Sequence, residues 1–114
     1  MGVQLDGKPW FAMDAGEIII PRGVHKIEFL KEQSTYSAAH VLLISGELVS
    51  AEFNPRSLNL NYIEDIAPCY VTVDKQPSNV KVDNVTYVPE VFSNTVNRFT
   101  MKLPKGKHNI AIDF

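Results

Sequence analysis

The 114-residue chain has one cysteine, no long apolar run and little net charge. Cys69 has no partner for a disulfide within the chain, and a lone cysteine does not identify the redox compartment. The 11 Lys and Arg residues are scattered and are outnumbered by 13 Asp and Glu residues, which argues against a nucleic-acid-binding surface. No apolar segment approaches the roughly 20 residues that a membrane-spanning helix needs.

Motifs for common enzyme chemistry are also missing. The sequence has no Gly-x-Ser-x-Gly nucleophile motif, its six glycines are isolated instead of forming a phosphate loop, and its cysteine and histidines lack metal-ligand spacing. Acidic residues could still meet in space, but 13 of them in a chain of this size are typical of a solvated surface. We therefore expect no catalytic residue, no metal and no cofactor.

The sequence does contain strand periodicity. Short alternating segments recur roughly every 8–12 residues, with turn residues such as Asp6-Gly7 and Ser45-Gly46 between them, which is typical of an antiparallel sandwich or barrel. Strands are expected at 3–5, 17–20, 24–30, 39–44, 47–53, 58–63, 69–74, 80–83, 98–103 and 108–114, with 85–88 extending 80–83. The sequence thus predicts one domain over residues 1–114, an all-β, two-sheet antiparallel β-sandwich with little or no helix.

One segment of the chain occurs twice. Ile18–Phe29 and Met101–Ile112 share the pattern apolar-x-apolar-Pro-basic-Gly-x-His-x-Ile-x-apolar, and Val3–Gly7 resembles Val80–Asn84. Two arrangements fit this repeat. Either both copies lie in one sandwich, or the first copy (within residues 1–30) is the tail of a preceding module and residues 36–114 form most of a second one.

The Pro-basic-Gly sequence in each copy predicts a tight turn. Gly23 and Gly106 should each lie in a tight turn that joins adjacent antiparallel strands, with positive φ at one or both. The repeat argument requires a hairpin in at least one copy. His25 and His108 each begin an inward-facing row, where a histidine usually bonds a backbone group and not a metal.

Aromatic and amide side chains are the candidates for ligand binding, because sugars stack on exposed rings and bind planar polar groups. Strand parity places Tyr70 on the wetter face of its strand, and Trp10 follows a turn from which it either caps the sandwich or protrudes. Asn59 and Asn61 point away from the apolar face of their strand. We expect these four residues to form a weak carbohydrate site, with core packing as the alternative for the two rings.

Two segments resemble a known family. Lys75–Asn84 is similar to the K-x-P-x-x-V-x-V-D-G segment, and Leu103–His108 to the L-P-x-G-x-H segment, of β-sandwich accessory modules in Bacteroidetes-like glycoside hydrolases and related surface proteins. The resemblance covers about residues 58–114, with Asn84 where glycine is expected.

This resemblance implies a non-catalytic, Ig-like module, often the C-terminal one, of a secreted, periplasmic or cell-surface bacterial protein. Such a module binds carbohydrate or packs against an adjacent catalytic domain. An Ig-like protein-interaction or spacer domain without a ligand is the alternative.

Overall fold

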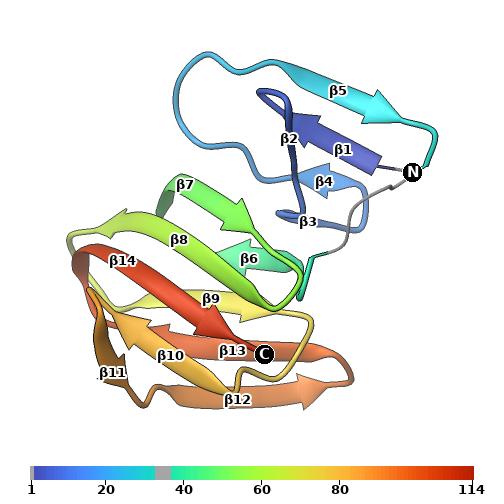
Figure 1. Ribbon diagram of the computed structural model, residues 1–114. Coiled ribbons are helices and arrows are strands. Elements are labelled where there is room, and N and C mark those ends of the chain that lie inside the picture. Colours follow the sequence, from blue (N-terminus) through green and yellow to red (C-terminus); the bar gives the residue numbers. More distant parts are fainter. Residues whose placement is uncertain (1, 33–36) are drawn as a thin grey trace.

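The computed structural model describes residues 2–32 and 37–114 (Figure 1). Strands, turns and irregular segments account for these residues, and none of them lies in a helix, so the expected all-β fold is confirmed. The described residues accordingly include no helix that could cross a membrane.

Residues 37–114 form a sandwich of two antiparallel sheets (Figure 1). The order in the first sheet is β11 (Val85–Tyr87), β10 (Asn79–Val82), β14 (Gly106–Asp113), β8 (Ser57–Glu64) and β7 (Glu47–Phe53). The order in the second sheet is β12 (Glu90–Thr95), β13 (Arg98–Leu103), β9 (Cys69–Val73) and β6 (Val41–Ile44).

Alternation along these strands builds the core between the two sheets, because every second side chain of a strand points to the same face. In β8, for example, Leu58, Leu60 and Tyr62 are fully buried while Asn59 and Asn61 lie on the outer face. The core side chains that meet there are Leu58, Leu60, Tyr62, Ile110 and Ile112 from the first sheet and Cys69, Val71, Val73, Met101 and Leu103 from the second.

Residues 2–32 form a smaller unit, drawn above the sandwich in Figure 1. In it β1 (Gly2–Leu5) pairs with β2 (Lys8–Pro9) and with β5 (Ile27–Leu30), and β3 (Met13–Asp14) forms a hairpin with β4 (Glu17–Ile18). The order β2-β1-β5 repeats β11-β10-β14, and the pair β3-β4 repeats β12-β13.

The strand registers of the two copies also coincide. Val3 lies opposite Phe29 as Val80 lies opposite Ile112. Likewise, Gly2 lies opposite Leu30 as Asn79 lies opposite Asp113, and Gln4 and Glu28 correspond to Lys81 and Ala111. The sequence repeat is therefore a structural repeat of five strands.

The predicted hairpins at the two glycines are wrong. Gly23 and Gly106 do have positive φ, +114° and +111°, but β4 and β5 lie in different sheets, and so do β13 and β14. The repeated segment is a crossover between two sheets. Neither copy therefore forms the hairpin that the repeat argument required. The evidence for the repeat is instead the matching strand registers.

The predicted strand boundaries differ from the structure in a few places. Residues 85–87 turn back to pair with β10 and do not extend it, since Asp83 and Asn84 adopt left-handed conformations with φ of +50° and +67°. The sequence prediction also missed β2, β3 and β12. Part of the loop before residue 37 lies outside the described residues.

The two units share one hydrophobic core. At their junction Ala12 and Val41 form a parallel bridge that places β3 beside β6, and the Val41 N–H donates to the Phe11 carbonyl at 3.0 Å. Trp10 packs edge-on against Phe53 with ring centroids 5.3 Å apart. The smaller unit is thus built onto the β6–β7 side of the sandwich.

The position of Trp10 predicts a large loss of stability in the variant Trp10→Ala. Truncation leaves a cavity between the two units, so the free energy of unfolding measured by urea denaturation should fall by about 3–5 kcal/mol. Tyr70→Ala is the control, because a half-exposed ring on the outer face should change this energy by about 0.5 kcal/mol or less. Equal losses in the two variants would contradict the assignment of Trp10 to the core.

Candidate functional site

The four residues expected to bind carbohydrate do not form one site. Trp10 is only 4% exposed and its indole N–H donates to the Ile19 carbonyl at 2.9 Å, so neither face of its ring is open to a sugar. Tyr70 is 38% exposed on the outer face of the β9 sheet. Asn59 and Asn61 lie on the outer face of the other sheet, on the opposite side of the sandwich.

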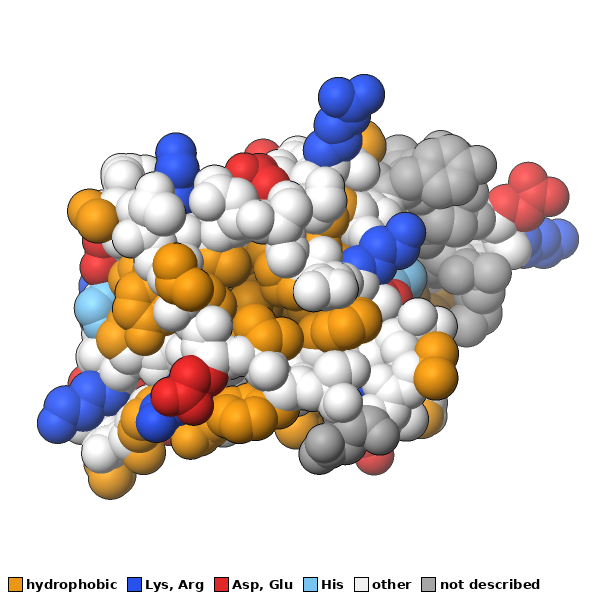
Figure 2. Space-filling view, turned by 90° about the horizontal axis from the view of Figure 1, so that it is seen from below, with side chains coloured by type: hydrophobic (Ala, Val, Ile, Leu, Met, Phe, Trp, Pro, Cys, Tyr) orange, Lys and Arg blue, Asp and Glu red, His pale blue; other side chains and the backbone are white. Residues whose placement is uncertain are grey.

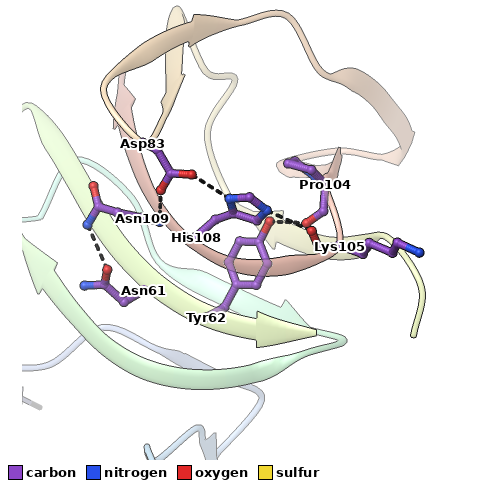
Figure 3. A network of polar contacts seen from close by, with 7 residues as sticks. All are labelled: Asn61, Tyr62, Asp83, Pro104, Lys105, His108 and Asn109. Carbon is purple, nitrogen blue, oxygen red and sulfur yellow. Dashed lines mark hydrogen bonds and ion pairs between the residues drawn. The ribbon is translucent and has the colours of Figure 1, made fainter. Parts of the chain in front are cut away.

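Asn61 belongs to a polar network at the crossover between β13 and β14 (Figure 3). Its amide nitrogen donates to Ser50 Oγ at 2.8 Å, and its amide oxygen accepts from the Asn109 side chain at 2.9 Å. Nearby, the Tyr62 hydroxyl donates to the Pro104 carbonyl at 2.5 Å. The bonds to Ser50 and Asn109 already engage both polar atoms of the Asn61 side chain.

The centre of this network is an Asp–His–carbonyl clasp (Figure 3). Asp83, in the turn between β10 and β11, accepts from the Asn109 backbone N–H at 2.9 Å and from His108 Nδ1 at 2.6 Å. His108 Nε2 donates to the Lys105 carbonyl at 2.8 Å. The clasp therefore joins the end of β10, the start of β14 and the crossover in one set of hydrogen bonds.

The first copy contains the same clasp. Asp6 accepts from the Lys26 N–H at 2.8 Å and from His25 Nδ1 at 2.6 Å, and His25 Nε2 lies 3.0 Å from the Arg22 carbonyl. The sequence prediction that each histidine bonds a backbone group is confirmed, although it missed the aspartates. Asp6 and Asp83 stand 19 and 25 residues before their histidines, but they occupy the same position in the matching segments Val3–Gly7 and Val80–Asn84, and this shared position could have indicated them.

The clasp explains the glycine of the repeated pattern. Gly106 has a φ of +111°, which disfavours any other residue, and a Cβ there would lie 3.1 Å from His108 Nε2. The ring folds back over the glycine to reach the carbonyl beyond it, so the pattern Pro-basic-Gly-x-His encodes this closure.

Both clasp histidines carry a positive charge when all their hydrogen bonds are made. A carboxylate and a carbonyl are acceptors only, so both ring nitrogens must donate. Asp83 accordingly raises the pKa of His108, and Asp6 raises the pKa of His25. In return, the Asn109 N–H and His108 lower the pKa of Asp83, and His25 and the Lys26 N–H lower the pKa of Asp6.

This arrangement does not suit catalysis. A general base needs a ring nitrogen with a free lone pair facing a substrate or nucleophile, and both nitrogens of His25 and His108 are occupied. His40 pairs with Asp74 through Nδ1 at 3.0 Å, but no hydrogen bond among the described residues joins it to a hydroxyl or thiol. Throughout residues 2–32 and 37–114, no three His, Cys, Asp or Glu side chains are grouped to hold a metal ion.

An apolar groove lies at the opposite end of the sandwich from the smaller unit. Figure 2 views this end and shows hydrophobic side chains gathered around a hollow. The hollow has a volume of about 210 Å³ and opens between β10–β11 and the start of β12. We call it the interaction groove; its apolar lining consists of Pro77, Val80, Tyr87, Val88, Pro89 and Val91.

The corresponding surface is covered in the first copy. Trp10 bonds Val3 as Tyr87 pairs with Val80, so Trp10 and Tyr87 are counterparts. Trp10 and the two residues after it are buried against β6 and β7, whereas Val88, directly after Tyr87, is 90% exposed. The sequence analysis missed this groove, although the apolar residues concentrated at 85–92 were a visible signal.

The clasps predict a pH dependence of stability. Because the folded pKa of each clasp histidine is raised, its contribution is complete below pH 6.5 and is lost as the pH rises through the raised value. The Asp contribution is present above pH 3.8 and is lost as the pH falls through the lowered value. The free energy of unfolding should therefore be highest between these limits.

This dependence is measured by urea denaturation from pH 5 to 9. The double variant His25→Gln/His108→Gln should lose most of the decline above pH 6.5. His40→Gln is the control, since it leaves both clasps intact, and should keep that decline. An unchanged decline in the double variant would show that the clasps do not cause it.

Comparison with known proteins identifies no relative of the chain. No family model matches it, and neither does a curated protein or a solved structure. The internal repeat consequently supplies the informative comparison, because each copy shows what surrounds the same five strands in a second setting.

Proposed function

We propose that the protein is a non-catalytic β-sandwich module that binds neighbouring polypeptide domains through its interaction groove. The observation that carries this proposal is the different fate of one surface in the two copies. In the first copy a folded unit covers the surface at Trp10, and in the second copy the counterpart surface is open and apolar. Burial of such a surface is favourable by roughly 25 cal/mol per Å² of apolar area.

The covered copy also indicates what kind of partner the groove takes. At the junction β6 offers a backbone N–H, that of Val41, to the Phe11 carbonyl. β7 ends in Phe53, whose ring packs against the rings of Trp10 and Phe11 at 5.3 and 5.5 Å. A partner for the groove should likewise present a strand edge and an aromatic side chain, as another sandwich of this kind does.

A scaffolding role is consistent with the chemistry of the described residues. The two clasp histidines have no free ring nitrogen, and the groove is lined mainly by apolar side chains. Carbohydrate binding is the less favoured function, because Trp10 is buried and Tyr70 faces away from Asn59 and Asn61. The secreted, periplasmic or cell-surface setting belongs to the same proposal and depends on the accessory-module resemblance.

The groove can be tested with a tandem protein in which a second copy of residues 32–114 follows Phe114. This fusion reproduces the spacing between β5 and β6, because Leu30 corresponds to Asp113. Amide hydrogen exchange at residues 87–91 should be slower by about tenfold or more than in the single chain, and small-angle scattering should show one rigid particle.

Substitutions in the first sandwich of the tandem protein provide the control. Val88→Asp should restore fast exchange at the groove and separate the two sandwiches. Val96→Asp, at a residue 83% exposed in the β12–β13 turn, should have no such effect. Groove amides that exchange in the tandem protein as they do in the single chain would disprove the proposal.

A further inference from the structure

Among the described residues, the β5 edge of the three-stranded sheet in the smaller unit has no strand beside it. β5 pairs with β1, and no other strand among residues 2–32 and 37–114 pairs with its second edge. Its counterpart β14 pairs with β10 on one edge and with β8 on the other, from Gly106 opposite Glu64 to Asp113 opposite Ser57. The same difference holds for β4, which among the described strands pairs only with β3, while β13 pairs with both β12 and β9.

Side chains at core positions are exposed along this open side. Phe29 takes the position of Ile112 and is 62% exposed, whereas Ile112 is fully buried. Ile20 takes the position of Leu103 in the repeated pattern and is 42% exposed, against 1% for Leu103. Both residues are exposed where the second copy has β8 and β9 as cover. An open edge flanked by exposed apolar side chains readily pairs with another strand.

We propose that this open side binds a partner segment of four strands arranged as β6–β9 are in the sandwich. One of its strands, the equivalent of β8, would pair antiparallel with β5. The strand would alternate apolar and polar residues, as β8 does, so that its apolar side chains cover Ile27 and Phe29. A second strand, like β9, would pair with β4 and cover Ile20. The proposal concerns the opposite end of the molecule from the interaction groove and goes beyond the function proposed for that groove.

The binding surface already has its final form in the absence of the partner. The clasp of Asp6 and His25 fixes the crossover between β4 and β5 in the geometry that the complete sandwich uses at Asp83 and His108. Binding therefore requires no rearrangement of these strands, which lowers its cost in conformational entropy.

The partner strands cannot be β6–β9 of this molecule, and they cannot be β6–β9 of a second molecule of the same chain. In every molecule β8 already lies between β14 and β7, and β9 lies between β13 and β6. A second molecule could reach β5 only with an edge strand, for example by pairing its β5 with this β5. Such a dimer is one of the outcomes that the test distinguishes.

The test is a fusion of the full chain in which residues 37–78 are added directly before Gly2. This design repeats the connection of the second copy, where Ser78 precedes Asn79, the counterpart of Gly2. A short covalent link gives an effective concentration on the order of millimolar. The amides of β5 that point away from β1 should exchange freely in the original chain and become protected by about tenfold or more in the fusion.

The matched control carries Leu58→Asp and Leu60→Asp in the added segment only, which should abolish this protection. Protection in the fusion but not in the control supports the proposal. The proposal fails if the β5 amides remain unprotected, if both fusions protect them equally, or if sedimentation shows that the original chain forms a dimer through β5. Val88→Asp should leave the result unchanged, so failure of the groove and failure of this edge are distinguishable.

Discussion

The hydrogen-bonded closure between an aspartate and a histidine at each crossover is the constraint on which the rest of the structure depends. The chain leaves one sheet and enters the other within a few residues. Asp83 holds His108 and the Asn109 N–H on β14, and His108 in turn bonds the Lys105 carbonyl in the crossover. β14 is the central strand of the five-stranded sheet. Its position beside β10 therefore also determines where β8 and β7 lie.

The two copies of the five-strand unit differ in their surroundings and not in their internal order. The first copy has its Trp10 side covered and its β5 edge open, while the second has β14 paired on both edges and the Tyr87 side open. Each copy thus shows in a folded state the contact that the other lacks. The second arrangement considered for the repeat, in which the first copy is the tail of a preceding module and residues 36–114 form most of a second one, stays a prediction.

Local patterns predicted much of this fold. The strands 47–53 and 98–103 were predicted with their observed limits, and the outward positions of Tyr70, Asn59 and Asn61 followed from alternation alone. Non-local contacts could not be predicted in this way. The Pro-basic-Gly segment is compatible with a hairpin, but in the structure it is a crossover between two sheets, and the carboxylate that holds the following histidine is distant in the sequence.

Burial of Trp10 and exposure of Val88 were equally inaccessible to sequence reasoning. Both residues follow a short strand in corresponding parts of the repeat, and what separates them is the unit that packs on one copy and not on the other. A parity rule describes the two faces of a strand, and it carries no information about what covers the end of a sandwich.

The parallel bridge between Ala12 and Val41 has a mechanical consequence. Units tethered by a loose segment would swivel freely, but here backbone hydrogen bonding and a shared core run through the joint. The smaller unit consequently keeps a set orientation within a molecule that measures 37 × 30 × 25 Å. An assembly that used this joint repeatedly would be stiff, with a fixed step and a fixed angle for each unit added, and would form a helical filament or, if the rotation closes, a ring.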